Sequence, residues 1–370
     1  MFRCFASCSF GLESEVAFEL KKAGFSNVKS CDARVYFDAN EGDIFHANLI
    51  LRTADRVYIE IGKFIANTFD ELFNKTASLR FEDYIPKDAA FPVTADSVKS
   101  DLKSVSDIQS ICKKAIVERL KLKYHISHFP ESKERYNVYV NILKDTVTVS
   151  LNTSGEGLNR RGYRIKNVAA PIRETLAAGI LLLSRYKGES NFLDPLCGSG
   201  TIAIEAALIA KGILPGAKRS FDIENWRAFD LTKLKELRYS KKDLNKNVKL
   251  QAFDIDEKAV YAARANAASA GVLGDIEFKV RDVSKLELKN FYGNIVSNPP
   301  YAIRIGEQNG VRELYKNMGK VLLPNYNSNL SIICADDEFE RYFGKRADSK
   351  RKLYNGNIRC TLFKYRKNAK

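Results

Sequence analysis

The segment from Asp194 to Thr201, DPLCGSGT, lies between a predicted strand and an alanine-rich predicted helix. In an open α/β sheet, this kind of strand-to-helix turn is where the ligand binds. Gly198 and Gly200 would let the backbone approach a ligand closely, and the Asp194 carboxylate favours a positively charged ligand. A nucleotide-phosphate loop would instead need a lysine after the glycines or a third glycine. The loop therefore predicts a site for a cationic ligand, with a purely structural turn as the alternative.

Acidic residues also follow the next two predicted strands. Asp254, in the segment FDID, could accept hydrogen bonds from both hydroxyls of a ribose, and Asp282 could accept from an exocyclic adenine amine. Either residue alone would more often be a helix N-cap. Because acids recur at three strand ends, we expect them to share one nucleoside ligand.

The fourth predicted strand is followed by Asn298, Pro299, Pro300 and Tyr301. Two prolines cannot continue a central strand, so the backbone is held just outside the sheet, with the Asn298 amide oxygen and the Pro299 carbonyl free to accept. An exocyclic amine has two hydrogens to donate to them, and Tyr301 could stack on an extruded base. The loop predicts a catalytic site for an amine, although Asn-Pro alone also occurs in ordinary turns.

These loops need a sheet to bring them together. Residues 168–370 alternate strands and helices in the manner of a doubly wound Rossmann-like sheet. The predicted strands are 191–194, 249–254, 276–281, 294–297 and 330–334. The predicted helices are 172–184, 201–211, 257–270 and 310–323.

Two smaller α/β units and a linker precede this domain. Residues 1–64 predict a ferredoxin-like domain, with strands at 2–9, 35–37 and 58–64 and helices at 12–23 and 44–51. Residues 65–155 repeat the pattern, with helices at 69–73 and 108–122 and strands at 90–94, 137–143 and 146–151. Lys144-Asp145 predicts a hairpin between the last two strands. Residues 156–167 predict a glycine-rich basic linker.

Charge indicates the partner. The chain has 60 Lys and Arg against 45 Asp and Glu, a formal net charge of +15, which favours a polyanion such as RNA. Lys113 and Lys114 on a predicted helix, and Arg160, Arg161 and Arg164 in the linker, are the expected phosphate contacts. A solvated helix face is the alternative for the two lysines.

Other functional classes are disfavoured. The seven cysteines are scattered without a CxxC pair, and the three histidines have no completing ligands, so we expect no metal site and no disulfide framework. No uncharged apolar run reaches about 18 residues, so we expect no membrane span. A reducing, cytoplasmic location fits this composition.

The loops resemble the S-adenosylmethionine site of class I methyltransferases of the amino-directed group. Over nearly its full length, the chain resembles the THUMP-domain RNA guanine-N2 methyltransferases, close to the bacterial large-subunit ribosomal RNA type. The segments that carry this resemblance are LRTADRV at 51–57, SDIQ at 106–109 with KKAIV at 113–117, LNRRGYR at 158–164, APIRE at 170–174 and the two loops described above.

The resemblance implies roles for these residues. The loop with Asp194, Cys197, Gly198, Gly200 and Thr201 would bind the cofactor, Asp194 and the glycines at its methionine end. Asp254 would bind the ribose, Asp282 the adenine, and residues 298–301 the target amine. Residues 65–155 would be an RNA-binding THUMP domain. Bifunctional relatives carry a second methyltransferase domain, and because this chain ends too early for one, a single modification activity is expected. The implied target is 23S ribosomal RNA, with tRNA as the alternative.

Three further functions use similar motifs. DNA adenine-N6 methyltransferases and enzymes that methylate a release-factor glutamine share the Asn-Pro-Pro-Tyr loop, but the first 155 residues resemble an RNA-docking module. A non-catalytic RNA-binding or ribosome-assembly protein would not need the set of Asp194, Asp254 and Asn298. We therefore expect an RNA methyltransferase.

Overall fold

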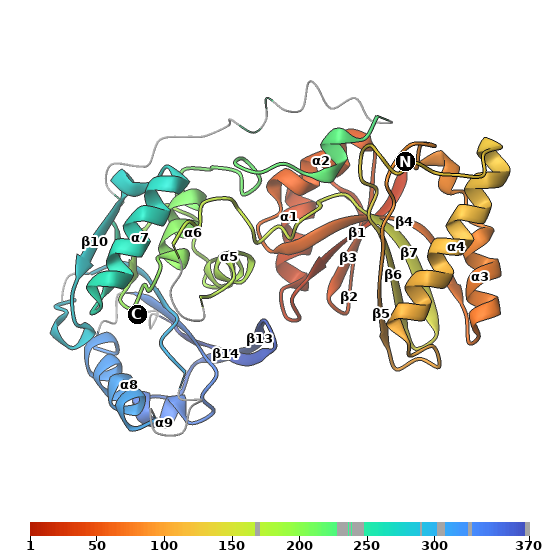
Figure 1. Ribbon diagram of the computed structural model, residues 1–370. Coiled ribbons are helices and arrows are strands. Elements are labelled where there is room, and N and C mark those ends of the chain that lie inside the picture. Colours follow the sequence, from red (N-terminus) through yellow and green to blue (C-terminus); the bar gives the residue numbers. More distant parts are fainter. Residues whose placement is uncertain are drawn as a thin grey trace.

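The computed structural model describes residues 1–166, 171–227, 236, 238, 248–288, 291–301, 308–324 and 328–366. The strands within these residues form two seven-stranded sheets, one in each half of the chain. Figure 1 shows the sheets in two lobes, which meet where helix α1 of the first lobe lies beside helix α5 of the second.

The first sheet has the strand order β2-β3-β1-β4-β7-β6-β5. Its strands are β1 (Phe2–Cys8), β2 (Ser26–Cys31), β3 (Arg34–Ala39), β4 (Ala54–Ile65), β5 (Val93–Val98), β6 (Val138–Leu143) and β7 (Thr146–Asn152). Strand β4 pairs with β1 on one side and with β7 on the other. The predicted ferredoxin-like and THUMP parts therefore share one continuous sheet, and the predicted boundary between residues 64 and 65 falls at the end of this shared strand.

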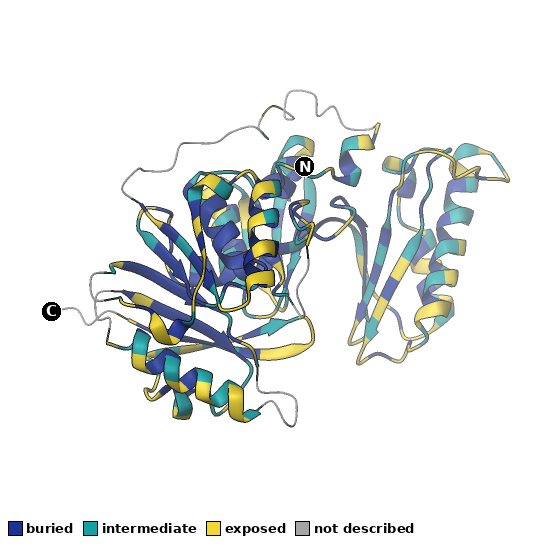
Figure 2. Ribbon diagram, turned by 60° about the vertical axis from the view of Figure 1, so that its left-hand side comes forward, coloured by how far each residue is buried: buried dark blue, intermediate teal, exposed yellow. Residues whose placement is uncertain are grey.

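Four helices cover one face of this sheet. They are α1 (Glu13–Lys22), α2 (Glu41–Ile50), α3 (Phe69–Ala77) and α4 (Val105–Tyr124). Side chains alternate between the two faces of a strand; in β6, Val138, Val140 and Ile142 are fully buried. Tyr139 and Asn141 of the same strand line an open hollow of about 1240 Å³ on the opposite face. Figure 2 shows this alternation of buried and exposed positions along the strands.

The turns of the first lobe follow from local sequence. Lys144 and Asp145 have φ angles of 49° and 61°, the left-handed values that a two-residue hairpin turn requires, which confirms the predicted hairpin. Asn40 caps α2 by accepting from the Asp43 backbone N–H, and Ser104 caps α4. Strand β2 was not predicted because its segment SNVKSC is mostly exposed and lacks an alternating apolar pattern.

The second sheet has the order β10-β9-β8-β11-β12-β14-β13, with parallel pairing from β10 to β12, which confirms the predicted doubly wound fold. The strands are β8 (Asn191–Asp194), β9 (Leu250–Asp254), β10 (Ile276–Val280), β11 (Gly293–Ser297), β12 (Asn329–Cys334), β13 (Ser349–Asn355) and β14 (Ile358–Tyr365). The helices are α5 (Glu174–Leu183), α6 (Thr201–Ala210), α7 (Glu257–Ala270), α8 (Gln308–Leu322) and α9 (Phe339–Phe343).

The antiparallel hairpin of β13 and β14 and the short helix α9 were not predicted. Basic residues dominate the sequence of this part of the chain, so its apolar positions give no clear strand pattern. In the structure, Leu353 and Leu362 are nevertheless fully buried. The hairpin also contacts the first lobe: the Arg351 side chain donates to the Gly11 carbonyl at 2.8 Å and to the Ser14 hydroxyl at 2.8 Å. It therefore forms a second connection between the lobes.

A buried cluster of charged residues holds the two lobes together. The Arg161 side chain is 2% exposed and lies 3.4 Å from the Glu205 carboxylate of α6. Arg161 also donates to the carbonyls of Leu158 at 2.6 Å and Arg52 at 2.5 Å, and the Tyr163 hydroxyl donates to Glu205 at 3.0 Å. The segment predicted to be a basic linker is therefore packed into the junction.

The first lobe contributes a second acid to this cluster. The Glu19 carboxylate of α1 accepts from the backbone N–H groups of Arg52 and Thr53, at 2.9 Å and 3.1 Å, and from the Thr53 hydroxyl at 2.6 Å. Burial raises the pKa of Glu19 and lowers the pKa of Arg52. Both groups thus experience the low polarity of the junction.

Glu205→Gln should strongly destabilise the full chain, because the Arg161 charge would stay buried without its partner. Loss of one member of a buried pair costs about 3–5 kcal/mol. The free energy of unfolding in urea measures this loss. The control is Glu313→Gln, which removes a carboxylate that is 54% exposed and paired with Lys316; it should change stability by about 1 kcal/mol or less. Equal effects of the two substitutions would contradict the role of the cluster.

Candidate functional site

The candidate site lies at the carboxyl ends of β8 and β11. The chain passes from β8 outward to β9 and β10, then returns to β11 on the other side of β8. Strands β8 and β11 pair directly, with Leu193 opposite Ile295. This reversal of strand order is the position where open α/β sheets bind ligands. It brings the Asp194 loop and the Asn298 loop to neighbouring strand ends.

The glycine loop after β8 is held tightly against β9 and α7. The Cys197 backbone N–H donates to the Phe253 carbonyl at 2.7 Å, and the Gly198 N–H donates to the Asp254 carboxylate at 2.8 Å. Gly200 has a φ of 82°, and a Cβ there would lie 2.9 Å from the Ala263 Cβ. Only glycine fits this position without strain.

Asp194 is the most deeply buried acid of the site. It is 1% exposed, and its carboxylate accepts from the Leu196 backbone N–H at 3.3 Å. Burial, with the nearby Asp254 charge, raises the pKa of Asp194 to about 8. Within the described residues no basic side chain pairs with it. This carboxylate therefore suits a ligand that brings its own positive charge.

The other two acids already have backbone partners. Asp254 accepts from Gly198 and, at 3.0 Å, from the Asp256 N–H. Asp282 accepts from the Ser284 N–H at 2.8 Å as the cap of a short 3-10 turn (Val283–Lys285), and this bond lowers the pKa of Asp282. The N-cap alternative thus describes Asp282 correctly, while both carboxylates retain lone pairs for a ligand.

Ile255 was not among the predicted site residues. It directly follows Asp254 and is 64% exposed, and Val280, paired opposite Asp254, is 53% exposed. Together they leave an apolar patch beside the acids, where a flat ring could rest. An isoleucine between two aspartates after a buried strand is the sequence signal that could have identified this patch.

The Asn298 loop is fixed by hydrogen bonds from its own tyrosine and from α8. The Tyr301 hydroxyl donates to the Asn298 amide oxygen at 2.7 Å, and the Tyr315 hydroxyl donates to the Pro300 carbonyl at 2.9 Å. The Asn298 oxygen was expected to be free, but one of its lone pairs is engaged. Burial raises the pKa of Tyr301, so its hydroxyl stays protonated and can donate.

The β13–β14 hairpin reaches this loop as well. The Cys360 Sγ of β14 lies 3.6 Å from the Tyr301 hydroxyl. Tyr301 is half-buried and its ring packs against both hydrophobic cores of the chain, so much of the ring surface is already covered. Tyr315 and Cys360 are site residues that sequence reasoning missed, since they lie 14 and 59 residues after Tyr301 in elements without a motif.

The predicted RNA contacts divide into buried and exposed residues. The expectation for Arg161 is wrong, because its guanidinium is buried and donates to partners inside the junction. Arg164 is 15% exposed; it pairs with Glu174 at 2.7 Å and donates to the Thr201 hydroxyl at 3.1 Å, so it ties the linker to the start of α6. Arg160 is 68% exposed.

The two helix lysines also differ. The Lys113 ammonium lies 3.4 Å from the centre of the Phe91 ring and pairs with Glu131 at 2.6 Å, so it is held within the first lobe. Lys114 is exposed. Of the predicted RNA contacts, Arg160 and Lys114 thus have the accessibility that phosphate contact requires.

The described residues contain neither a candidate metal cluster nor a helix that could span a membrane. No group of three or more His, Cys, Asp or Glu side chains in this part of the chain is arranged to hold a metal ion. None of the described helices combines the length and apolar character needed to cross a bilayer.

Family models match three segments of the chain. Residues 3–58 match the RlmL ferredoxin-like domain, residues 66–152 match the THUMP domain, and residues 161–364 match the RMKL-like methyltransferase domain.

Curated relatives cover nearly the whole chain. The chain is 41% identical over 366 residues to "Putative RNA methyltransferase YpsC" of Bacillus subtilis (strain 168), covering 97% of this chain and 94% of the relative. It is 31% identical over 375 residues to "Ribosomal RNA large subunit methyltransferase K/L" of Shewanella baltica (strain OS195). That alignment covers 98% of this chain but only 52% of the relative, so the chain spans about half the length of the K/L proteins.

Solved structures share the complete fold. SMU.472, described as "a putative methyltransferase complexed with SAH", has a TM-score of 0.93 and 36% identity, covering 100% of this chain and 99% of its own. A protein from Listeria monocytogenes described as a "predicted N6-adenine-specific DNA methylase" has a TM-score of 0.91 and 41% identity, covering 98% and 96%. By the extent of these matches, the chain belongs to the RMKL-like methyltransferase family and carries that family's ferredoxin-like and THUMP domains.

Proposed function

We propose that this methyltransferase uses S-adenosylmethionine to modify the exocyclic N2 amine of a guanosine in 23S ribosomal RNA. The observation that carries the proposal is the Asn298–Tyr301 loop. This loop follows β11, and β11 pairs with β8, which ends at the buried Asp194. The name of the K/L relatives supports a ribosomal RNA target. The structure of SMU.472 with SAH supports the cofactor.

Three carboxylates and the glycine loop would hold the cofactor. Asp194 fits its cationic methionine end, because this buried acid has no basic partner among the described residues. Asp254 would accept from the ribose hydroxyls and Asp282 from the adenine amine, with Ile255 under the ring. Gly198, whose N–H donates to Asp254, and Gly200, which has no room for a Cβ, hold the loop in place for this contact. When bound, the cofactor supplies a methyl group activated by a positively charged sulfur.

The protein must also make the target amine reactive. The lone pair of an exocyclic guanine amine is delocalised into the ring, which makes the amine a weak nucleophile. The remaining lone pair of the Asn298 oxygen, together with the Pro299 carbonyl, can accept its two hydrogens and draw the nitrogen toward a tetrahedral shape. Tyr301 fixes the Asn298 amide by donating to its oxygen. Such positioning can lower a barrier by roughly 7–11 kcal/mol.

Two other substrates use the same chemistry. A tRNA guanosine would present the same amine, and the Listeria monocytogenes structure is described as a DNA adenine methylase. The matched THUMP domain and the formal net charge of +15 favour RNA over a protein substrate. The names of the ribosomal relatives favour 23S RNA over tRNA. The cytoplasm is the proposed location.

Asn298→Ala should strongly slow methyl transfer without impairing binding. Loss of one hydrogen-bond partner that acts in the transition state lowers kcat by roughly 100-fold to 1,000-fold. Calorimetry with SAH and filter binding with RNA should both give wild-type affinities. Asn67→Ala, at an exposed position of the first lobe, is the matched control and should keep full activity. Unchanged turnover in Asn298→Ala would contradict the role of the loop.

Deletion of the gene should remove N2-methylguanosine from large-subunit ribosomal RNA. Mass spectrometry of nucleosides from separately purified ribosomal RNA and tRNA, compared with the parent strain, measures this change. Loss from tRNA alone would show that the proposed substrate is wrong and the proposed chemistry right. If no methylated nucleoside is lost from either fraction, an RNA methyltransferase function is contradicted.

Binding of SAH should release a proton near neutral pH. Because the pKa of Asp194 is raised to about 8, the free protein holds this carboxyl protonated at pH 7, whereas a cationic ligand requires its charged form. Affinity should rise by up to about tenfold per pH unit between about pH 6 and pH 7.5. Calorimetry at pH 7 in two buffers of different ionisation enthalpy should count close to one proton released.

The same shift predicts the pH dependence of folding. In the cofactor-free chain the pKa of Asp194 lies above its unfolded value of 3.8, so folding takes up a proton between about pH 4 and pH 8. The contribution of Asp194 to stability is therefore lost as the pH rises through this interval. Asp194→Asn should remove both this slope and the proton release. A proton release of zero in the wild-type protein would contradict the contact between Asp194 and the cationic end.

A further inference from the structure

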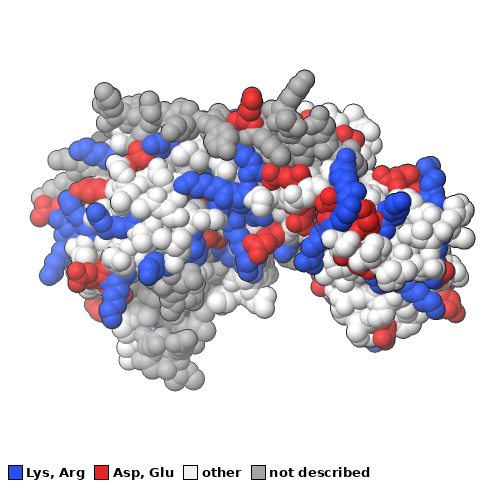
Figure 3. Space-filling view, turned by 45° about the horizontal axis from the view of Figure 1, so that its top comes forward, with Lys and Arg blue, Asp and Glu red and all other residues white. Residues whose placement is uncertain are grey.

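A basic hollow lies at the junction of the two lobes. It has a volume of about 830 Å³ and is formed by the segment after β7, the residues before and at the start of α5, and the loop at 218–222. Six of its lining residues are basic: Arg160, Arg161, Arg164, Arg173, Lys218 and Arg219. Three are acidic: Glu156, Glu174 and Asp222. Figure 3 shows Lys and Arg side chains gathered where the lobes meet, with acidic side chains among them.

Three of these cations build the wall of the hollow. Arg161 and Arg164 have the internal partners described above. Besides the Ser220 carbonyl at 3.4 Å, Arg219 donates to four backbone carbonyls of the segment 154–160, those of Ser154 at 3.1 Å, Glu156 at 2.7 Å, Gly157 at 2.5 Å and Arg160 at 3.3 Å. These bonds fold the segment 154–160 around one guanidinium. Two of the acids are also engaged, since Glu174 pairs with Arg164 and Asp222 accepts from Asn137.

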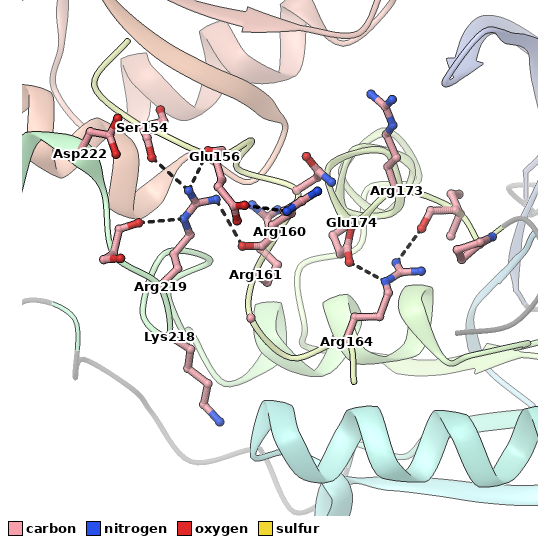
Figure 4. A pocket seen from close by; sticks show the side chains of 15 residues that line it. Ser154, Glu156, Arg160, Arg161, Arg164, Arg173, Glu174, Lys218, Arg219 and Asp222 are labelled. Atoms are coloured by element: carbon pink, nitrogen blue, oxygen red, sulfur yellow. Dashed lines mark hydrogen bonds and ion pairs between the residues drawn. The ribbon is translucent and has the colours of Figure 1, made fainter. Parts of the chain in front are cut away.

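The other three cations that line the hollow are exposed. The Arg173 side chain makes no hydrogen bond or ion pair within the part of the chain that the structure describes, and it points away from the Arg164–Glu174 pair in Figure 4. Among the described residues, Arg160 forms an ion pair only with the exposed Glu156, and a pair between two exposed charges is weak, so phosphate can replace it. Lys218 donates to the Ser269 carbonyl and is exposed.

The position of these cations relates the two functional parts of the chain. In the view of Figure 4, Arg160 lies between Lys218 and Arg173. At one side, Ser154 lies two residues after the end of strand β7 of the THUMP part. At the other, a Cβ at Gly356, in the tip of the β13–β14 hairpin, would lie 4.0 Å from the Arg173 guanidinium. The same hairpin contacts Tyr301 through Cys360.

Helix α5 adds to the positive potential. Arg173 is its N-cap residue, and no side chain caps the helix there. The first N–H groups of a helix carry partial positive charge and favour an anion nearby. A row of cations, an uncapped helix end and a concave wall of fixed shape together suit a polyanionic chain.

We propose that Arg160, Arg173 and Lys218 bind consecutive phosphates of the RNA substrate, guiding the strand from the THUMP domain to the Asn298 loop. The proposal rests on the proposed function for the nature of the substrate. It differs from the sequence-based expectation in its residues. Arg161 and Arg164 shape the hollow, whereas Arg173, from the segment APIRE, and Lys218 make contacts beside Arg160.

The test is the salt dependence of RNA affinity for the triple variant R160Q/R173Q/K218Q. The probe is 23S RNA from the deletion strain, bound between 50 mM and 200 mM salt. Each lost phosphate contact should reduce the slope of log affinity against log salt by about 0.7, so the triple variant should lose about 2. We expect its affinity at the lowest salt to fall roughly tenfold or more.

The control variant K279Q/K316Q/R341Q removes the same charge elsewhere. These residues lie on β10, α8 and α9, with side chains 53%, 48% and 75% exposed. The control should keep the wild-type slope within experimental error. Equal loss of slope in both variants would show a general charge effect and overturn the proposal.

Folding and catalysis are measured separately. SAH affinity and the thermal midpoint of the triple variant should match the wild type; if they do not, the single variant R173Q, with an expected slope loss of about 0.7, takes its place. If the wild-type enzyme is active but the triple variant keeps the wild-type salt slope, the proposed phosphate contacts in the hollow are wrong. The proposed function then stands. Failure of the wild-type chain to bind RNA at all would instead overturn the proposed function.

Discussion

The buried charge of Arg161 is the constraint on which the arrangement of the lobes depends. A guanidinium removed from water costs several kcal/mol unless its partners are complete. Here they come from both lobes, the Arg52 carbonyl from the first and the Glu205 carboxylate from the second. Helix α6, which carries Glu205, begins at the glycine loop, where Thr201 accepts from Arg164. Docking of the first lobe and the position of the candidate cofactor loop therefore depend on one ten-residue helix.

Much of the second lobe could be predicted because its local signals agree with its tertiary fold. Apolar strands of four to six residues alternate with helices, and the loops with chemical character directly follow strands β8, β9 and β11. Parallel strands place such loops at one edge of a sheet, so position along the chain was enough to bring Asp194 near Asn298. The Lys144-Asp145 hairpin was predictable for a similar reason, since its turn is local.

What could not be predicted depends on partners far apart in the chain. Arg161 looked like a surface residue because it follows another arginine in a glycine-rich segment, and Glu205 lies 44 residues away in an apolar helix. The bond between Tyr301 and Asn298 is local, but the support that Tyr315 and Cys360 give depends on how α8 and β14 pack. Strand β4 was expected to end one domain, and only the pairing on its second edge shows otherwise.

The shared strand β4 has a consequence for the first lobe as a folding unit. If residues 1–53 were cut away, β4 would lose its partner β1 and would present unpaired backbone groups along its outer edge. Such an edge invites pairing with other chains and aggregation. The ferredoxin-like and THUMP segments are therefore parts of one cooperative structure. Neither is expected to be stable and soluble as an independent fragment.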